Sequence, residues 1–433
     1  MSRFFIFLSV FSCIFFIVDF YGYQGIKQLT HRMSNRKRKF LRWLYWIPSI
    51  LTLTLIIILA SGSRESVNNK SFGFFYFATG FIFLFLLPKT IFLVFHLLND
   101  CLKLLNWTRK KFQKKVEKES VDPNAMESEK MTRIQFFNQV GLGAAAITFG
   151  GTLYGIVQGK YDFRVMNESI KFKNLPPLFS GMRIVQISDA HLGSFLDNSF
   201  NEVSGAIDLI NSLKPDIIFF TGDLVNNFAE EAEPWIETFA RLQAPFGKFS
   251  ILGNHDYAEY VYDPNDELTL PLRTANMQKL EGIHKAMGFR LLRNEMVLLE
   301  KGGQNIELIG IENWGRGRFS KHGDLELAMQ NTTPDAFRIL LSHDPSHWEE
   351  QVLGKKDIAL TFSGHTHGAQ FGLEAPMLHI KISPSPLFGY KRWGGLYNEG
   401  EQYLYVNRGF GFLGFPGRVG IPPEITCVDI LKG

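Results

Sequence analysis

Cysteine is scarce in this chain of 433 residues, which has only Cys13, Cys101 and Cys427, far apart along the sequence. Three cysteines without paired spacing argue against a disulfide framework and against a cysteine-rich zinc site. Net charge is also small, with 46 basic and 42 acidic side chains and a formal charge of +4. This balance, and the lack of a basic stripe in the second part of the chain, argue against nucleic-acid binding and against a nuclease.

Polar faces are missing from the first three of the four long apolar stretches near the N-terminus. About 20 apolar residues let a helix cross a bilayer, whereas a helix of a soluble bundle keeps a polar side. The third stretch contains Pro88 and Lys89, which indicate a kink or a site facing other helices. The fourth is rich in glycine and alanine, which suits close helix packing in lipid. We therefore predict that residues 1–160 form a membrane region with four transmembrane helices, at about 4–23, 43–61, 72–98 and 136–157.

Acidic residues are absent from the loop between the first two stretches, which carries seven lysines and arginines. The segment 99–134 is also rich in basic residues. By contrast, the loop between the second and third stretches has only two basic residues, Arg64 and Lys70. Basic loops remain in the cytoplasm, so we expect a multi-pass protein whose C-terminal domain lies outside it. If only three stretches span, that domain returns to the cytoplasm.

The composition from residue 161 onward is that of an ordinary α/β domain, with short β-branched runs alternating with helical patterns. Helices are expected over residues 200–213 and 230–242. Five apolar runs end in a small residue followed by Asp, Asn or His, in the motifs DAHLG, TGDLV, GNHDY, SHDPSHW and SGHTHG. In open α/β sheets the carboxyl ends of the strands form the ligand crevice.

These five motifs supply a set of oxygen and imidazole donors without a thiolate. Taken singly, each motif has an ordinary explanation as a turn, a helix cap or a surface histidine. Five at the same structural position favour a pair of divalent ions such as Mn, Fe, Zn or Co. The side chains delivered there are Asp189, His191, Asp223, Asn254, His255, His343, His365 and His367.

The ordered series Asp-x-His, Gly-Asp, Gly-Asn-His-Asp, His and Gly-His-x-His resembles the calcineurin-like metallophosphoesterases, from about Ile170 to the C-terminus. It is most similar to their membrane-attached bacterial branch, whose closing block is Gly-His-Thr-His-Gly-Gly-Gln; here Ala369 replaces the second glycine. The resemblance implies an α/β fold over residues 161–433. Two mixed β-sheets would pack as a sandwich flanked by helices, after the four-helix transmembrane region.

The resemblance also implies a role for each residue. Asp189, His191 and His367 would hold one divalent metal ion. Asn254, His343 and His365 would hold the second, and Asp223 would bridge both. His255 would lie near the scissile phosphate without binding metal, oriented by Asp256. Such an enzyme uses metal-bound hydroxide to cleave a phosphoester.

Two segments rich in glycine and aromatic residues, 385–397 and 408–420, follow the last motif and are candidates for the rim of the pocket. Ordinary strand and turn packing explains most of these aromatic residues equally well. Four basic side chains in them are candidate phosphate contacts: Lys391, Arg392, Arg408 and Arg418.

Three functional hypotheses remain open. The first is a membrane-anchored phosphohydrolase of a bacterial inner membrane, with a lipid-linked or membrane-proximal substrate and its catalytic domain outside the cytoplasm. The second is a cytoplasm-facing pyrophosphatase of a nucleotide-linked lipid precursor, since related phosphoesterases cleave UDP-diacylglucosamine. The third is a membrane sensor or transporter whose phosphoesterase-like domain only binds ligand. The complete set of ligands, and membrane spans with few charges, argue against the third.

Overall fold

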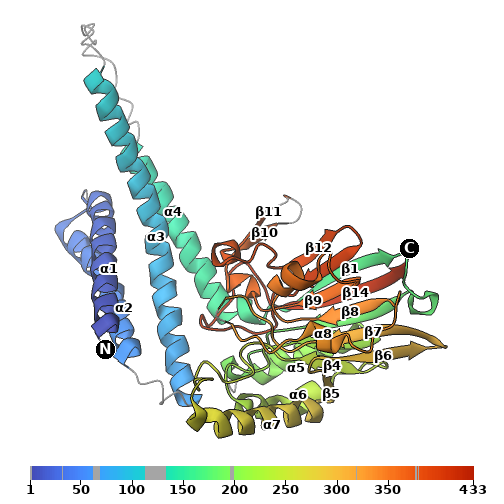
Figure 1. Cartoon of the computed structure of the whole chain (residues 1–433). Helices are drawn as coiled ribbons and strands as arrows, with labels where there is room; N and C mark the ends of the chain where they lie inside the picture. The colour runs from blue at the N-terminus through green and yellow to red at the C-terminus, as the bar shows by residue number, and fades with distance from the viewer. Residues whose placement is uncertain are drawn as a thin grey trace. The chain divides into compact units, whose positions relative to one another are not determined.

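The chain divides into two compact units in the computed structural model (Figure 1). One unit comprises Met1–Ser63 and Phe74–Tyr154, and the other comprises Arg64–Gly73 and Gly155–Gly433. We call them the membrane unit and the catalytic unit. The structure describes residues 2–31, 33–61, 69–112, 133–195, 199–317, 319–375, 378 and 380–433.

The N-terminal region contains four long helices: α1 (Ser2–Leu29), α2 (Asn35–Ser61), α3 (Asn69–Phe112) and α4 (Arg133–Val157). Among the described residues, three segments are long and apolar enough to cross a membrane: Asn35–Leu59, Gly73–Arg109 and Phe136–Val157. They overlap the second, third and fourth predicted spans, although the second prediction ends two residues later and the third begins one residue earlier. The first predicted span lies in α1, and most of its side chains lie outside the described part of the chain, so its crossing stays a prediction.

Lys89 lies inside α3, and its side chain faces two other helices. Its Nζ lies 3.0 Å from Asp19 Oδ1 on α1 and donates to the Tyr45 carbonyl of α2 at 3.3 Å. Asp19 is only 4% exposed. Of the two expectations raised by Pro88 and Lys89, a site facing other helices is thus confirmed.

The first sheet of the catalytic unit has the order β1-β14-β2-β3-β4-β5. Strands β2 to β5 are parallel, while β14 is antiparallel to β2 and parallel to β1. The sheet is therefore mixed. Its strands are β1 (Arg164–Phe172), β2 (Met182–Ile187), β3 (Ile217–Thr221), β4 (Lys248–Ile251), β5 (Phe289–Leu291) and β14 (Glu424–Lys432).

The second sheet has the order β12-β13-β9-β8-β7-β6 and is also mixed. Its central strands β13, β9, β8 and β7 are parallel, and an antiparallel strand closes each edge. A separate hairpin pairs β10 (Leu373–Ala375) with β11 (Ile380–Ile382). The strands of the sheet are β6 (Glu295–Lys301), β7 (Gln304–Gly310), β8 (Arg338–Leu341), β9 (Leu360–Ser363), β12 (Gly395–Glu399) and β13 (Gln402–Val406).

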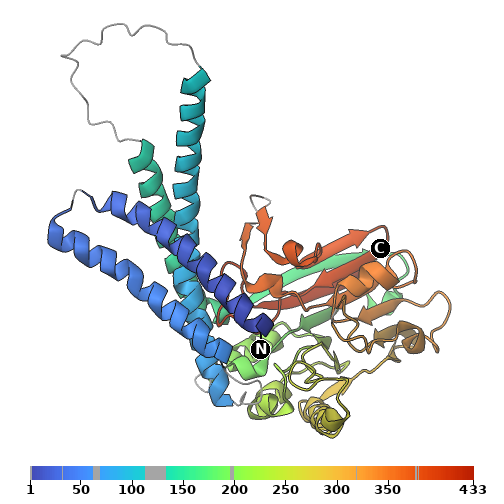
Figure 2. The ribbon, with the colours of Figure 1, turned by 60° about the vertical axis from the view of Figure 1, so that its left-hand side comes forward.

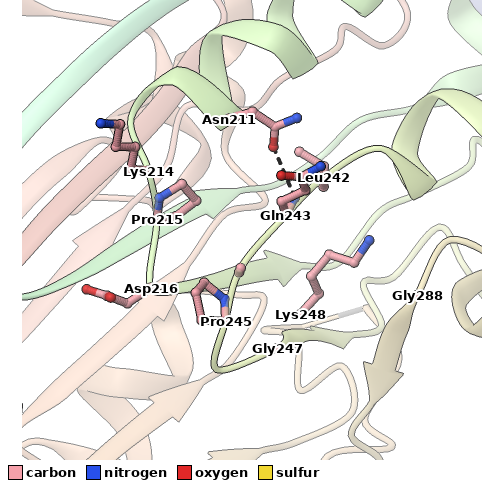
Figure 3. Close-up of a pocket in the computed structure, with 11 residues that line it drawn as sticks. Asn211, Lys214, Pro215, Asp216, Leu242, Gln243, Pro245, Gly247, Lys248 and Gly288 are labelled. Atoms are coloured by element: carbon pink, nitrogen blue, oxygen red, sulfur yellow. Dashed lines mark hydrogen bonds between the residues drawn. The ribbon is translucent and has the colours of Figure 1, made fainter.

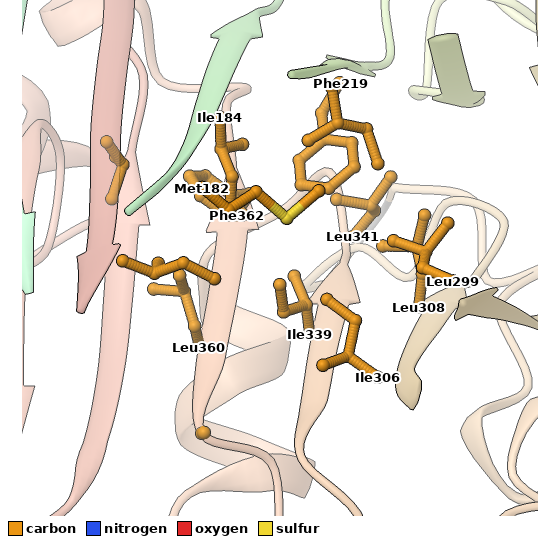
Figure 4. Packing of buried hydrophobic residues seen from close by; sticks show 14 of the residues in the cluster. Met182, Ile184, Phe219, Leu299, Ile306, Leu308, Ile339, Leu341, Leu360 and Phe362 are labelled. Carbon is orange, nitrogen blue, oxygen red and sulfur yellow. The ribbon is translucent and has the colours of Figure 1, made fainter. Parts of the chain in front are cut away.

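The main core lies between the two sheets, where apolar side chains of both sheets meet. Figure 4 shows Met182, Ile184 and Phe219 of the first sheet near Ile339, Leu341 and Phe362 of the second. The rings of Phe219 and Phe362 meet edge to face at 5.4 Å between centroids. Each such buried side chain contributes about 1.5–3 kcal/mol to folding. The predicted sandwich is confirmed.

Helices flank this sandwich. The expected helix over residues 200–213 is present as α5 (Phe200–Ser212), with α6 (Ile236–Ala240) and α7 (Leu270–Ala286) beside it (Figure 2). α8 (Leu325–Ala328) packs on the second sheet. The helix expected over 230–242 is wrong in its first half, where a 3-10 helix covers Ala229–Trp235. Pro234 lacks the N–H that a regular α-helix needs there.

Candidate metal centre

Five strand ends bring the predicted site residues to one edge of the sandwich. β2, β3 and β4 are parallel neighbours in the first sheet, and β8 and β9 are parallel neighbours in the second. Because parallel strands present their carboxyl ends at the same edge, the loops after them meet there. All seven predicted metal ligands are brought together, and two groups of three have donor atoms within 4.8 Å of one another: Asp189, His191, His367 and Asp223, His343, His365.

The first group places two imidazoles and a carboxylate in contact. His191 Nε2 lies 3.1 Å from His367 Nε2, and His367 Nε2 lies 3.3 Å from Asp189 Oδ1. Asp189 and His191 are fully buried. The carboxylate of Asp189 also accepts the backbone N–H of His365 at 3.0 Å. This hydrogen bond joins the loop after β2 to the loop after β9.

The second group is joined by Asn254, the seventh predicted ligand. Asn254 Oδ1 lies 2.7 Å from His365 Nδ1 and 3.2 Å from His343 Nε2. Its amide nitrogen donates to the Tyr260 hydroxyl at 2.8 Å, so its oxygen is turned toward the two histidines. The Nδ1 of His343 lies 2.7 Å from the Thr221 carbonyl and donates to it, leaving the Nε2 lone pair for a cation.

Asp223 lies between the two groups. Its Oδ2 is 3.6 Å from His191 Nε2 of the first group and 3.2 Å from His343 Nε2 of the second. Its other oxygen, Oδ1, accepts the backbone N–H of His255 at 2.9 Å, which fixes the carboxylate. One oxygen atom thus faces both sets of donors.

The backbone is strained at the centre. Asp189, His191, Asp223, His365 and His367 all have positive φ angles, between 44° and 70°. Each residue with a side chain costs on the order of 1–2 kcal/mol in this left-handed region. Strain of this kind collects at functional sites, where the surrounding structure holds it in place.

Gly364, between β9 and the first histidine of the last motif, has no room for a side chain. A Cβ there would lie 2.0 Å from Ser188 Oγ and 2.2 Å from Asp189 Oδ2. The close approach lets the loops after β2 and β9 touch, and this contact brings their ligands together.

Electrostatics at the centre favours positive charge. Burial opposes ionisation of Asp189, but the neighbouring His367 outweighs it, and the pKa of Asp189 falls to about 2. The pKa of Asp223 is lowered as well, because His343 and His255 outweigh the effect of its burial. Burial tends to lower the pKa of His343, yet Asp223 raises it to about 10. Without a metal ion, a proton on His343 therefore compensates the negative charge of Asp223. A bound cation would take over this role.

His255 lies at the border of the two groups. Its Nδ1 lies 2.7 Å from the Asn226 carbonyl and donates to it, and its ring meets that of His191 edge to face at 4.9 Å. The expected orientation of its ring by Asp256 is wrong. The Asp256 carboxylate instead accepts the backbone N–H groups of Asp223, Leu224, Val225 and Gly253, at 2.8–3.3 Å. Asp256 thus holds the loop that carries Asp223.

Two family models match the chain. "Probable Calcineurin-like phosphoesterase, transmembrane domain" matches residues 2–160, and "Calcineurin-like phosphoesterase" matches residues 182–369. The uncharacterized metallophosphoesterase YkuE of Bacillus subtilis is 32% identical over 310 residues, which are 70% of this chain and 98% of YkuE. The chain is a calcineurin-like metallophosphoesterase. This metallophosphoesterase is a phosphoester hydrolase with a transmembrane region, as the motifs predicted.

Two further relatives each match more than half of this chain. UDP-2,3-diacylglucosamine pyrophosphatase LpxG of Chlamydia trachomatis is 33% identical over 302 residues, covering 60% of this chain and 87% of LpxG. A transmembrane protein with metallophosphoesterase domain from Danio rerio is 30% identical over 291 residues. That match covers 67% of this chain and 62% of the Danio rerio protein.

The donor set of this metallophosphoesterase fits divalent metals, which its family uses. Imidazole nitrogens and carboxylate oxygens, with one amide oxygen and no thiolate, suit borderline to hard divalent ions. Two ionised, buried carboxylates also need compensating charge. Two groups of ligands are therefore present, each able to hold a cation.

Several residues around the centre were missed in the sequence. The Tyr390 hydroxyl lies 2.7 Å from His365 Nε2 and donates to Asp344 at 3.1 Å, which holds the ring of His365. Asn226 anchors His255, as described above. Asp344 directly follows His343, and Tyr390 lies in segment 385–397, the candidate rim of the pocket. Asn226 had no such signal and reaches the site through folding.

The four candidate phosphate contacts differ in their surroundings. Arg392 pairs with Glu349 and Glu399, and Arg408 pairs with Glu374 and Glu424. Arg418 is buried behind His367, with Nη2 3.3 Å from His367 Nδ1. Lys391 is exposed. Two of the four basic side chains, Arg392 and Arg408, are thus paired with glutamates. Arg418 contacts the proposed metal ligand His367 and is not exposed to solvent.

A hollow of about 800 Å³ in the described part of the chain lies away from this centre. Figure 3 shows Lys214, Pro215 and Asp216, which precede β3, and Pro245 and Gly247, which precede β4. These loops lie at the amino ends of the parallel strands, opposite to the ligands. This hollow is therefore not part of the metal centre.

Proposed function

We propose that the protein is a membrane-anchored phosphohydrolase with two divalent metal ions. Asp189, His191 and His367 hold one ion, and Asn254, His343 and His365 hold the other. Asp223 is shared between them. The position of Asp223 Oδ2, 3.6 Å from His191 Nε2 and 3.2 Å from His343 Nε2, carries the proposal, because a shared carboxylate lowers the repulsion between two neighbouring cations.

When bound, two such cations acidify water and neutralise charge on a phosphate. The chain supplies the rest. The Nδ1–H of His255 is held by the Asn226 carbonyl, so Nε2 is the atom that exchanges a proton with the leaving oxygen. Asp256 holds the Asp223 loop by accepting three of its backbone N–H groups, and it also accepts the N–H of Gly253 in its own loop. Tyr390 and Asp344 fix the ring of His365.

The identity of the metals is part of the proposal. Oxygen and imidazole ligands favour Mn, Fe, Zn or Co. We propose that the protein is a multi-pass protein of a bacterial inner membrane. Its catalytic unit lies outside the cytoplasm and acts on a lipid-linked or membrane-proximal phosphoester. The basic residues of segments 24–42 and 99–134 support this orientation.

A second candidate is a pyrophosphatase that faces the cytoplasm and cleaves a nucleotide-linked lipid precursor. The similarity to LpxG, whose own substrate is UDP-2,3-diacylglucosamine, favours it. Topology separates the two, because nucleotide-linked precursors are cytoplasmic. Labelling of single cysteines placed at exposed positions of the catalytic unit, such as Leu298→Cys, with a membrane-impermeant reagent in intact cells would decide the side.

The test of the enzyme uses the full chain in detergent. Metals are removed by chelation, and Mn, Zn, Fe or Mg is added back. Hydrolysis of an aryl phosphodiester and of an aryl phosphomonoester is then measured. We expect metal-restored turnover that His367→Ala abolishes. Binding of two metals without turnover of either ester, or of UDP-2,3-diacylglucosamine, would favour the ligand-sensing hypothesis instead.

A further inference from the structure

The catalytic unit carries an exposed apolar surface beside the metal centre. Five large apolar side chains between residues 373 and 388 are 53–87% exposed. They lie on the β10–β11 hairpin and on the 3-10 helix Ser385–Phe388 that follows it. Single exposed apolar residues are normal, but five on adjoining elements indicate an interaction surface. The apolar hairpin surface, as we call it, consists of Leu373, Leu378, Ile382, Leu387 and Phe388.

The base of this hairpin lies next to the end of the helix α4. Gly155, in the last turn of α4, accepts the backbone N–H of Arg418 at 3.1 Å. A Cβ on Gly417 would lie 2.7 Å from the Gly155 carbonyl, so the two backbones are in contact. The next residue, Val419, accepts the N–H of Gly372, the residue before β10, at 2.9 Å.

One short segment, Gly417–Val419, therefore contacts both the end of α4 and the start of the hairpin. Successive residues in an extended chain advance about 3.3 Å, so the hairpin base lies within about 10 Å of the last turn of α4. The apolar segment Phe136–Val157 ends in that same turn. The hairpin base thus lies near the point where the apolar part of α4 ends.

The apolar hairpin surface is also attached to the metal centre. Ser383, directly after β11, donates to the Gly368 carbonyl at 2.7 Å, between His367 and Ala369. Tyr390, two residues after Phe388, lies 2.7 Å from His365 Nε2. Whatever binds the apolar hairpin surface therefore also fixes the position of the metal centre relative to that binding partner.

The charge of the segment suits an anionic surface. Residues 373–392 contain Lys381, Lys391 and Arg392 and one acidic residue, Glu374, which pairs with Arg408. Lys381 and Lys391 are exposed, and Arg316, whose Nη1 donates to the Gly389 carbonyl at 3.5 Å, is exposed as well. Exposed apolar side chains flanked by basic ones are typical of surfaces that bind lipid headgroups.

We propose that the apolar hairpin surface docks on the bilayer into which the apolar helices of this chain insert. Its five side chains enter the interfacial layer, and the attached metal centre lies at the level of the lipid headgroups. Resting on the proposed function, this assigns the substrate class: a phosphoester of an amphiphile that stays in the bilayer while its phosphate is cleaved.

The docking is tested with spin labels on the full chain in nanodiscs of phosphatidylethanolamine and phosphatidylglycerol. In a background without native cysteines, labels are placed by Leu378→Cys and Leu387→Cys. Controls on other faces use Leu298→Cys and Leu327→Cys, whose side chains are exposed at 49% and 47%. We expect the first pair to be accessible to oxygen and shielded from a water-soluble nickel complex, and the controls to show the reverse.

Two outcomes would overturn the docking. One is equal nickel accessibility at all four positions, which means that the surface faces water. The other is shielding with dipolar coupling between labels of two chains, which means that a second copy covers the surface. Neither result depends on enzyme activity, so failure of the proposed function leaves this test intact.

The substrate class is tested with Leu387→Asp combined with Phe388→Asp. Hydrolysis of a water-soluble aryl phosphodiester is compared with that of hexadecyl p-nitrophenyl phosphate placed in the same nanodiscs. We expect the double variant to keep turnover of the soluble ester and to lose most turnover of the lipid ester. Equal retention of both activities would overturn the assigned class. If the wild-type chain cleaves neither ester, the proposed function fails instead.

Discussion

Two clusters of buried polar side chains, one in each unit of the molecule, are built in opposite ways. In the membrane unit, Lys89 lies 3.0 Å from Asp19 and donates to Tyr45 and Ser49, so positive and negative groups satisfy one another. In the catalytic unit, the nitrogen and oxygen atoms of imidazoles and carboxylates converge instead, as with His191 Nε2 and His367 Nε2 at 3.1 Å.

The difference separates a structural cluster from a functional one. The membrane cluster is complete without a ligand, and it holds three helices together in surroundings that offer no water. The cluster of the catalytic unit keeps two ionised, buried carboxylates among imidazole donors, an arrangement that suits bound cations. Five of its residues also have positive φ angles, a backbone strain that the surrounding structure holds in place.

The largest effect is expected from Asp223→Ala. It removes the only oxygen atom that faces both ligand groups in the described structure. We expect the bound metals to be lost and hydrolysis of an aryl phosphodiester to fall by more than about a thousandfold. Metal content by mass spectrometry and steady-state kinetics measure the two effects. Asp208→Ala, at an exposed ion pair with Arg241, is the control; full metal content in Asp223→Ala would contradict the shared role.

His255→Asn sharpens the comparison, because His255 lies in the cluster without being a proposed ligand. We expect kcat to fall by about 10²–10⁴-fold, the usual size of a proton-transfer contribution, while both metals stay bound. His322→Asn, at a histidine whose side chain is 40% exposed, should leave both quantities unchanged. Loss of metal together with activity in His255→Asn would make His255 a ligand.

Asp19→Asn is the corresponding change in the membrane unit. It leaves the Lys89 ammonium without a counter-charge, and breaking a buried pair in this way costs about 3–5 kcal/mol. We expect the helices to unfold at a lower concentration of a denaturing detergent than in the unmodified protein. Circular dichroism measures this unfolding. Adding Lys89→Met removes the stranded charge and should restore most of the stability. Equal behaviour of the single and double variants would show that the pair is not structural.

The smallest effect concerns His284, a buried polar side chain that belongs to neither kind of cluster. Neither of its ring nitrogens has a hydrogen-bond partner among the described residues, and it packs near Phe220 and Phe289. We expect His284→Leu to stabilise the catalytic unit by about 1–3 kcal/mol, because an unsatisfied polar group leaves the core. Thermal unfolding followed by near-ultraviolet circular dichroism measures it.

The same histidine predicts a dependence on pH. Burial lowers the pKa of His284 to about 4, from an ordinary value near 6.5. Between about pH 6.5 and pH 4 this histidine is protonated in the unfolded chain but stays neutral in the folded chain. The free energy of unfolding therefore falls by on the order of 3 kcal/mol as the pH drops through this range. The gain from His284→Leu should therefore grow toward acid. A gain independent of pH would contradict a neutral, buried His284.

Much of the catalytic fold and its ligands could be predicted from the sequence, because each ligand follows a strand directly. A strand such as Leu360–Ser363 and the ligands His365 and His367 form one local pattern. The edge of a parallel sheet then brings distant patterns together without further information.

The parts that could not be predicted depend on contacts between distant segments. Tyr390 reaches His365 across a loop and a hairpin, and Arg418 reaches His367 from 51 residues away. Asp256 was given the wrong partner because its neighbour in sequence, His255, is not its neighbour in hydrogen bonding. The partner of Lys89 likewise lies on another helix, 70 residues away.

The central claim is that the catalytic cluster holds two cations in two distinguishable groups. The most direct measurement is the metal content per chain of the purified protein and of two variants, His367→Ala in the first group and His343→Ala in the second. We predict two ions in the unmodified chain and about one in each variant, since each group keeps most of its donors. A single ion or none in the unmodified chain would contradict the account.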